Sequence, residues 1–327
     1  MAFLGGPSVD VRLTAGRMWF CYDILTPMSR RLIAVLLLLV LLLTGWGYRK
    51  IILWTALTAL GRNPHCSMAS VFASPRNFVA IDSGVERTRA RCKILKREAG
   101  FWLWDTPMGH FWAPAPSTFV PFDVFEQETD IYGSGRDGVQ RADIVIDCGA
   151  NIGLFTAKAL KLGAGRVIAV EPGPENVECL QRNLAAEIRA GRVLIVPKGV
   201  WSREGFLRFI SEPDNSAGDH FADSDVTPGV GQQLPITTID RIVADLKLPH
   251  VDFIKMDIEG SEVPAIAGAT ETLRGSRPRL AICSYHKLDD PVTIPAAVRK
   301  INPAYIMRCG GCQRRGFSLE PLVLLFK

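Results

Sequence analysis

The stretch Asp143-Ile-Val-Ile-Asp-Cys-Gly-Ala-Asn-Ile-Gly153 decides the expected fold of this 327-residue chain. Its first half is a short apolar run bounded by charged residues, which is typical of a buried parallel strand. A turn containing Gly149 and Gly153 follows, and the residues from Leu154 to Leu162 favour a helix. A strand, a glycine-containing turn and the start of a helix form the ligand crevice of doubly wound α/β folds. The stretch therefore predicts a doubly wound α/β domain with a ligand site at this turn.

The spacing of the two glycines narrows the kind of ligand. A dinucleotide fingerprint needs a second glycine two residues after the first, and a P-loop needs a Lys-Ser/Thr pair; the segment has neither. Asp147 at the strand end would repel a phosphate, but it can meet a positive ammonium group directly or through water. The next strand, Arg166–Glu171, ends in an acid that can accept both hydroxyls of a ribose.

These features predict S-adenosylmethionine, a cationic nucleoside without a pyrophosphate, as the cofactor of a methyltransferase. A domain of the same fold that binds NAD or no ligand is the alternative. The predicted cofactor-binding residues are Asp147, Gly149, Ala150, Asn151, Gly153 and Glu171.

Later motifs make the sequence resemble the FkbM family of methyltransferases over about residues 126–290. They are Val170-Glu-Pro-Gly-Pro-Glu-Asn176, Thr237-Thr-Ile-Asp240 and Val251-Asp-Phe-Ile-Lys-Met-Asp-Ile-Glu-Gly-Ser-Glu262. The resemblance implies a class I, Rossmann-like fold with a mostly parallel seven-stranded sheet and an antiparallel last strand. It also implies O-methylation of a sugar, a lipid-linked glycan or a secondary metabolite. An N-directed or protein-directed methyltransferase and a non-catalytic membrane-associated module are the alternatives.

Two further predicted strands bring candidate catalytic residues to the ligand edge. Asp257 follows the strand that begins at Asp252, and His286 follows the strand Leu280–Ser284. His286 is the first candidate for the general base because its ordinary pKa suits proton transfer near neutrality. Asp257 is the second candidate, and it could instead orient the base or the substrate. A metal interpretation is a weaker alternative, with Mg²⁺ held by Asp257, Glu259, Glu262, Asp289 and Asp290.

The rest of the sheet is expected from shorter apolar segments. Val193–Val196 predicts the third strand, and Phe206–Ile210 with Leu234–Thr237 predicts an inserted hairpin. The polar loop between them, Ser211–Gly231, is either a lid on the acceptor side or a disordered connection. Ala304–Met307 and Leu322–Phe326 are expected to be the last two strands.

The N-terminal part carries an apolar run, Leu32–Leu43, with no charge between Arg31 and Arg49. A single-pass membrane anchor is the preferred interpretation, and a cleaved signal peptide or a buried helix are the alternatives. Met28 is an alternative start of the chain. The catalytic domain is expected in the cytoplasm, where S-adenosylmethionine is made. The expected organisation is a tail (1–31), an anchor and juxtamembrane segment (32–60), an N-terminal helix and cap (61–135), and the methyltransferase domain (136–327).

Charge and cysteine content exclude some partners. Lys and Arg exceed Asp and Glu by nine in residues 1–100 and fall short by four in the remainder. An acidic catalytic part argues against nucleic acid as a partner and leaves a small-molecule or glycan acceptor. Ser83–Glu98 is expected to form a solvated basic helix, and Phe101–Trp104 with His110–Trp112 to form two aromatic strands. Cys309-Gly-Gly-Cys312 is expected to be a turn with two free thiols.

Overall fold

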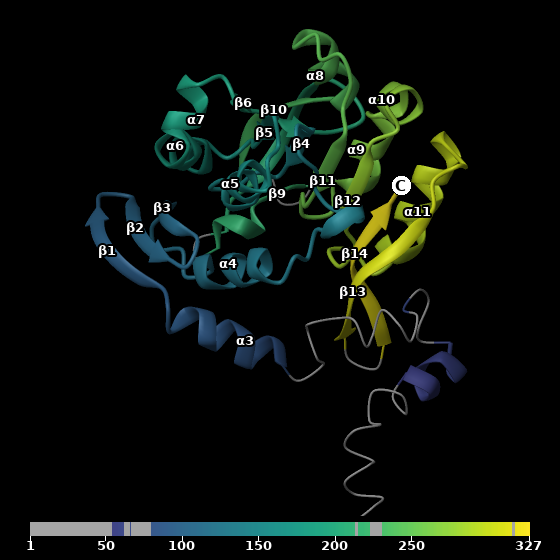
Figure 1. Cartoon of the computed structure of the whole chain (residues 1–327), viewed down its shortest axis with the longest axis horizontal. Helices are drawn as coiled ribbons and strands as arrows, with labels where there is room; N and C mark the ends of the chain where they lie inside the picture. Colours follow the sequence, from purple (N-terminus) through teal and green to yellow (C-terminus); the bar gives the residue numbers. More distant parts are fainter. Residues whose placement is uncertain (1–53, 62–65, 67–79, 213–214, 223–230, 316–317) are drawn as a thin grey trace, which may run out of the picture. The chain divides into compact units, whose positions relative to one another are not determined.

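The largest sheet of the protein has seven strands. The structure is a computed structural model, and it describes residues 54–61, 66, 80–212, 215–222, 231–315 and 318–327. All strands of the sheet are parallel except β14, which runs antiparallel to both of its neighbours (Figure 1). The predicted mostly parallel sheet with an antiparallel last strand is confirmed. In order across the sheet the strands are β13 (Met307–Arg315), β14 (Ser318–Phe326), β12 (Arg279–Cys283), β11 (Phe253–Met256), β4 (Ile144–Cys148), β5 (Arg166–Val170) and β6 (Val193–Val196).

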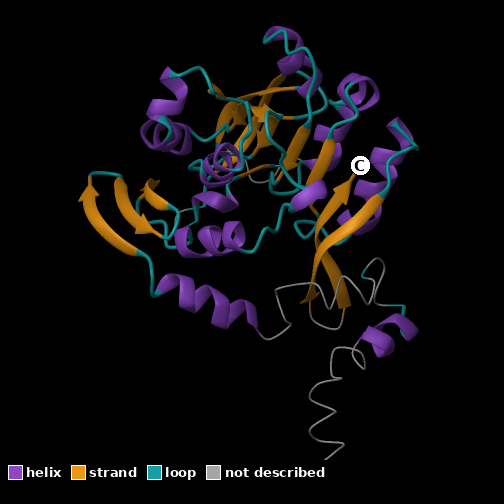
Figure 2. Cartoon of the chain, in the orientation of Figure 1, coloured by secondary structure: helices purple, strands orange, loops and turns teal. Residues whose placement is uncertain are grey.

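Helices cover both faces of this sheet because successive strand residues point to opposite sides. Ile146 and Ile254 pack into a core with α8 to α11, whereas Val145 and Phe253 pack on the other face with Phe155 of α5. Figure 2 shows purple helices on both sides of the orange central strands. The predicted doubly wound arrangement is therefore confirmed. The helices are α5 (Leu154–Lys161), α6 (Pro174–Asn183), α7 (Ala185–Arg189), α8 (Ile239–Asp245), α9 (Glu262–Ala267), α10 (Thr270–Gly275) and α11 (Asp290–Ile301).

Two smaller sheets flank the central one. The predicted hairpin is present as β8 (Gly205–Ile210) and β10 (Gln232–Thr237), in a four-stranded sheet of their own with β7 (Gly199–Val200) and β9 (His220–Phe221). The two predicted aromatic strands are confirmed as β2 (Phe101–Thr106) and β3 (Gly109–Pro114). They belong to a three-stranded sheet that is followed by α4 (Val120–Glu128) and a short 3-10 turn, η1 (Gly135–Asp137).

The expected continuous helix over Ser83–Glu98 is wrong in its second half. Helix α3 (Ala80–Arg89) ends early, and Lys93–Glu98 forms β1, which pairs antiparallel with β2. Lys96 and Arg97 of β1 lie over the rings of Trp112 and Trp102. Cation–π attraction and the apolar stems of the basic side chains therefore favour a strand here, which their charge alone did not indicate.

The C-terminal prediction also needs correction. Strand β13 begins at Met307 and continues through the Cys-Gly-Gly-Cys segment, where the ladder to β14 has two irregularities. Glycines accommodate such bulges in a strand, so the segment is not a turn. Cys312 forms a disulfide with Cys66, whereas Cys309 is in no disulfide. The prediction of two free thiols is therefore wrong for Cys312.

Most of the predicted membrane anchor, residues 32–60, lies outside the described residues. Its described part, residues 54–60, is helical from 54 to 59. Among the residues that the structure describes, no helix is long and apolar enough to cross a bilayer. All described residues belong to one unit, Lys50–Lys327.

Candidate active site

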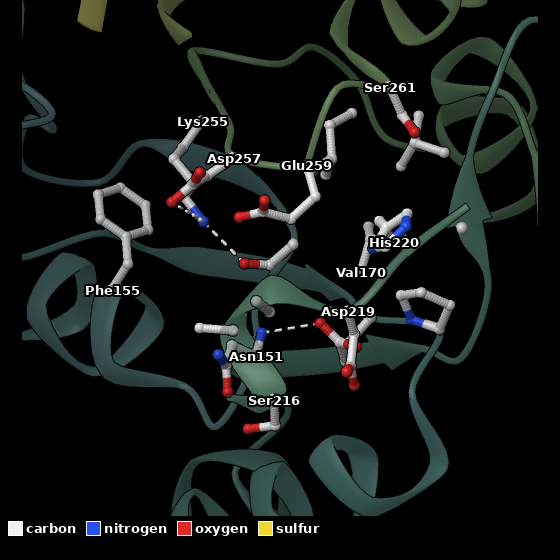
Figure 3. A pocket seen from close by; sticks show the side chains of 18 of the residues that line it. Asn151, Phe155, Val170, Ser216, Asp219, His220, Lys255, Asp257, Glu259 and Ser261 are labelled. Carbon is white, nitrogen blue, oxygen red and sulfur yellow. Dashed lines mark hydrogen bonds and ion pairs between the residues drawn. The ribbon is translucent and has the colours of Figure 1, made fainter. Parts of the chain in front are cut away.

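A cavity that is open to solvent lies at the carboxyl ends of β4, β5 and β11. Ligands of doubly wound sheets bind at this edge. Figure 3 shows Lys255, Asp257 and Glu259 on one side of it and Asn151, Ser216 and Asp219 on the other. Of the predicted residues, the cavity is lined by Gly149, Ala150, Asn151, Glu171 and Asp257, but not by Asp147, Gly153 or His286.

The loop between β4 and α5 is held in a left-handed conformation against β5. Gly149 and Asn151 have φ angles of +77° and +48°. The N–H groups of Gly149 and Ala150 both donate to the carbonyl of Val170 at 3.0 Å. The side-chain Oδ1 of Asn151 is buried and accepts no hydrogen bond. The hydrogen bonds to Val170 therefore hold the loop in place, and Asn151 Oδ1 remains available as an acceptor beside the cavity.

Glu171 connects this loop to the end of β5. Its Oε2 accepts from the N–H of Asn151 at 2.9 Å, and its Oε1 accepts from the N–H of Gly173 at 2.8 Å. Burial raises the pKa of Glu171, although these two N–H groups and Asn176 stabilise the charged form. Oε1 also accepts from Asn176 Nδ2 at 3.4 Å, so Oε2 is the oxygen that keeps a further lone pair for a ligand hydroxyl.

Gly153 acts in packing rather than in the cavity. It is the N-cap of α5 with a φ of +94°, and a Cβ there would lie 2.9 Å from Leu184 and 3.0 Å from Leu180. The absence of a side chain therefore lets α5 start close to the region of α6. This position supports the loop without contacting the ligand.

Asp147 does not line the cavity, and its side chain forms an internal ion pair; its contact with a ligand ammonium stays a prediction. Its fully buried side chain accepts from Thr156 Oγ1 at 2.7 Å and lies 3.3 Å from Lys255 Nζ. Lys255 sits directly opposite Asp147 in the parallel register of β11 and β4. It also donates to the carbonyl of Gly149 at 2.7 Å. Burial lowers the pKa of Lys255, but attraction to Asp147 and Asp257 outweighs it and raises that pKa.

The two predicted catalytic residues lie together, Asp257 in the cavity wall and His286 behind it. His286 Nε2 is 3.3 Å from Asp257 Oδ1 and 3.3 Å from Glu259 Oε1, and His286 Nδ1 is 2.8 Å from Glu262 Oε1. Asp257 and Glu259 face the cavity, and the His286 side chain is only 6% exposed. A group in the cavity therefore meets the two carboxylates before it meets the imidazole.

Charge around this cluster shifts both of its predicted catalytic groups. Burial lowers the pKa of His286, but Asp257, Glu259 and Glu262 outweigh it and hold that pKa well above its usual value. Burial likewise raises the pKa of Asp257, but Lys255, His286 and the hydroxyl of Tyr132 outweigh it and hold that pKa below its usual range. Three carboxylates around one imidazole thus stabilise a positive charge at this place.

Part of the polar loop Ser211–Gly231 lines the cavity from the other side. Residues 215–222 form a short 3-10 turn, η2 (Ser216–Gly218), and strand β9, which contribute Asp219 and His220 to the wall. Residues 223–230 lie outside the described residues. The described part of the loop is therefore a wall of the cavity.

Asp219 predicts a pH-dependent stability. Burial raises its pKa to about 7, and the negative charges of Glu171 and Glu175 also raise it. The hydrogen bond from the N–H of Glu212 acts in the opposite direction. The folded protein then binds more protons than the unfolded chain between the usual aspartate pKa and 7, so its stability falls as pH rises through that window. Asp219→Asn should raise the free energy of unfolding at pH 8 by about 1 kcal/mol after solvent screening, and less at pH 5. Urea unfolding at both pH values measures this.

The exposed residue Asp245 provides the matched control for that measurement. Asp245→Asn should give no gain in the free energy of unfolding at either pH. An equal gain from both substitutions would contradict the explanation by burial of Asp219.

Several cavity residues carried no recognisable signal in the sequence. Asp123 and Glu126 come from α4, and Tyr132 follows that helix. Lys255 lies within the Asp-Phe-Ile-Lys motif. A single lysine in an otherwise apolar strand is the signal that could have predicted a buried, paired side chain here. For α4 no motif marked the residues, because their role depends on where the helix packs.

Comparison with known proteins gives one family match. The family described as the Methyltransferase FkbM domain matches residues 147–305. The hexuronic acid methyltransferase AglP of Haloferax volcanii is 26% identical over 149 residues, which are 45% of this chain and 58% of that protein. The methyltransferase sdnD of Sordaria araneosa is 26% identical over 156 residues, 39% of this chain and 60% of that protein.

A solved structure is also similar to this chain. The FkbM methyltransferase of Methylobacillus flagellatus KT is 26% identical, with a TM-score of 0.43 over 57% of this chain and 44% of that one. The matched region spans about three fifths of the length of the two curated relatives.

Proposed function

Residues 147–305 belong to the FkbM methyltransferase family, and from this we propose that the protein transfers a methyl group from S-adenosylmethionine to a hydroxyl oxygen. The observation that carries the proposal is the charge of the cavity wall. Two lysines, Lys198 and Lys255, stand there against six acidic side chains: Asp123, Glu126, Glu171, Asp219, Asp257 and Glu259. Burial raises the pKa of Asp123 and of Asp219, so the negative charge comes mainly from the other four. Such a wall attracts a cationic ligand and repels a pyrophosphate.

The residues of the wall fit S-adenosylmethionine. Glu171 would hold a ribose hydroxyl through the remaining lone pair of its Oε2. The buried, unpaired Oδ1 of Asn151 offers a further acceptor to a ligand donor. When bound, the cofactor supplies a methyl group on a cationic sulfur that an oxygen nucleophile can displace.

The remaining chemical task for the chain is to position the acceptor hydroxyl and manage its proton. We propose Asp257 and His286 for this task. Asp257 faces the cavity, and His286 stands behind it at 3.3 Å, oriented by Glu262. Tyr132 donates to the other oxygen of Asp257 at 2.5 Å, which fixes the direction of the carboxylate.

The proposed acceptor class is a sugar, a lipid-linked glycan or a hydroxylated secondary metabolite. One relative is named a hexuronic acid methyltransferase. The carboxylates at the Asp257 end of the cavity are suitable acceptors for hydrogen bonds from sugar hydroxyls. Transfer of labelled methyl from S-adenosylmethionine to a panel of hexuronic acid and neutral sugar glycans tests the class.

Calorimetric titration with S-adenosylmethionine tests the function itself. The wild-type protein should bind one equivalent, and Glu171→Gln should bind about 10- to 100-fold more weakly because it loses charged hydrogen bonds. Glu178→Gln is the matched control, since Glu178 is an exposed residue of α6 that pairs with Arg182. Absence of binding by a folded wild-type protein would overturn the proposed function, and equal binding by both variants would remove Glu171 from the site.

Substitution of the proposed catalytic pair should affect turnover rather than cofactor affinity. Asp257→Asn and His286→Ala should each lower kcat by about 10²- to 10⁴-fold, with S-adenosylmethionine affinity changed only a few-fold. His250→Ala should keep wild-type turnover, because His250 is exposed. Single-turnover assays with an accepted glycan provide the measurement, and unchanged turnover in His286→Ala would exclude its role.

A further inference from the structure

Three donor atoms from the ends of β11 and β12 converge on one point beside the cavity. His286 Nε2 lies 3.3 Å from Asp257 Oδ1 and 3.3 Å from Glu259 Oε1. The side chains are 6%, 17% and 29% exposed, so the point is shielded on the protein side and open toward the cavity. Figure 3 shows the two carboxylates close together at this side of the cavity.

The atoms that converge are the ones left without hydrogen bonds. His286 Nε2 and Asp257 Oδ1 are both buried, and neither forms a hydrogen bond; they face each other as an ion pair at 3.3 Å. The opposite atoms of the same groups are satisfied, because Tyr132 donates to Asp257 Oδ2 at 2.5 Å and His286 Nδ1 is 2.8 Å from Glu262 Oε1. Buried polar atoms are rarely left unpaired, so two at one point indicate a missing partner.

Glu262 holds the imidazole in the orientation that a metal ligand needs. It is fully buried, and its Oε1 also accepts from the N–H of Ile258 at 3.1 Å, so the carboxylate is fixed. A carboxylate on Nδ1 makes that nitrogen the donor, so a metal that displaces the Nε2 proton would meet the Nε2 lone pair on the side of Asp257 and Glu259. Histidines that bind metals in proteins are commonly arranged in this way.

The backbone at Glu259 adds an independent observation. Glu259 has a φ of +51°, in the left-handed region that a residue with a side chain rarely adopts. Such a conformation persists where the surroundings require it, and it is concentrated at ligand-binding and catalytic sites. Here it brings the Glu259 carboxylate to the same point as Asp257 and His286.

From this arrangement we propose that Asp257, Glu259 and His286 bind one divalent cation of the Mn²⁺ type. Two carboxylate oxygens and one imidazole nitrogen form a donor set that such an ion accepts. Donors at about 2.1 Å from a metal lie roughly 3.0 to 3.4 Å apart in octahedral or tetrahedral geometry. The observed separations of 3.3 Å from Nε2 need little adjustment.

A second group, Glu262, His286 and Asp290, is also close enough to share an ion. Its atoms are already in use, because His286 Nδ1 pairs with Glu262 and Asp290 Oδ2 accepts from the N–H of Lys287 at 2.7 Å. Lys255 Nζ lies 3.9 Å from Asp257 Oδ2. It lies on the Tyr132 side of that carboxylate and leaves Oδ1 available.

The role of the ion rests on the proposed function, whereas its binding does not. Open coordination positions toward the cavity would take the oxygen of an acceptor hydroxyl and make its proton easier to remove. The ion would thereby position the acceptor hydroxyl relative to a cofactor held at Glu171. Asp257 and His286 would then hold the ion, and the acceptor proton would leave to water in the open cavity.

Titration of the metal-stripped full-length protein with Mn²⁺, followed by electron paramagnetic resonance of free Mn²⁺, tests the site. The wild-type protein should bind one equivalent. His286→Ala and Glu259→Gln should weaken binding at least about 100-fold, and Glu262→Gln about 10- to 100-fold, as expected for a residue that orients a ligand. His110→Ala is the matched control with wild-type binding, since His110 is an exposed residue of β3.

The outcomes separate the metal site from the proposed function. Calorimetry with S-adenosylmethionine and circular dichroism are run on the same samples. Folded wild-type protein that binds S-adenosylmethionine but no Mn²⁺ would overturn the metal site alone; Mn²⁺ binding without the cofactor would support the site and count against the function. Wild-type Mn²⁺ affinity in Glu259→Gln, whose partly exposed side chain makes it the variant that best preserves the fold, would also overturn the site.

Discussion

Gly149→Ala is expected to destabilise the protein by about 2–5 kcal/mol and to abolish binding of S-adenosylmethionine. A Cβ at this position would lie 1.9 Å from the backbone oxygen of Asp257 and 3.1 Å from Ile258 Cγ2. The φ of +77° adds strain for any residue with a side chain. Because the obstacle is backbone, it cannot rotate away, and the cofactor loop must separate from the end of β11. Urea unfolding and calorimetry measure the two effects.

Gly191→Ala measures the cost of a positive φ in the absence of a steric clash by the added Cβ. Gly191 has a similar φ of +69°, but nothing lies within 4 Å of the position that its Cβ would occupy. The substitution should cost only about 1–2 kcal/mol and leave cofactor binding unchanged. Equal losses of stability in the two variants would show that the close approach of Gly149 to Asp257 has no energetic weight.

Lys255→Met is the second substitution with a large expected effect, a loss of about 3–5 kcal/mol in the free energy of unfolding. The lysine is 3% exposed and pairs with the fully buried Asp147 at 3.3 Å. Its removal leaves that carboxylate uncompensated in the protein interior, and it also removes the hydrogen bond to the carbonyl of Gly149. Denaturant unfolding at pH 7 provides the measurement.

Two further variants test whether burial causes this effect. Arg241→Met removes an exposed ion pair with Asp245 at 2.9 Å and should cost no more than about 1 kcal/mol. Adding Asp147→Asn to Lys255→Met removes the uncompensated charge and should restore part of the lost stability. A Lys255→Met protein as stable as Arg241→Met would contradict an internal ion pair.

Both substitutions act on the same connection in the molecule. Gly149 follows β4, and Asp257 follows the neighbouring strand β11. Lys255 Nζ donates to Gly149 O, and the Gly149 backbone approaches Asp257 O. The cofactor loop and the proposed acceptor residues therefore form one rigid structure, and a change at either side should disturb both.

Local patterns were sufficient to predict the strands of the central sheet other than β13, which begins where the predicted strand Ala304–Met307 ends. Asp143–Gly153 became β4 and its loop, and the strands around Val193–Val196 and Leu280–Ser284 were confirmed within a residue or two. Apolar runs of this length bounded by turns report burial directly. The local pattern was misleading where a neighbouring strand determined the secondary structure. The basic segment Lys93–Glu98 forms a strand because it pairs with the aromatic strand β2.

Long-range contacts explain why the site was predicted only in part. Gly149, Asn151 and Glu171 line the cavity as expected because they follow strand ends, and parallel strands bring their carboxyl ends to one edge. The pairing of Asp147 with Lys255 depends on β11 lying next to β4, and no local pattern shows which strands are neighbours. The disulfide between Cys66 and Cys312 likewise joins segments 246 residues apart.

By itself, the sequence determined a doubly wound domain, the loop after Asp147 and the acid at Glu171, because each depends on residues close together in the chain. The tertiary structure alone decided that Asp147 forms an internal ion pair with Lys255. It also decided that Glu262 orients His286 toward Asp257 and Glu259. The physical reason is that charges within a few ångströms determine which groups remain available, and those distances are set by strand order and helix packing.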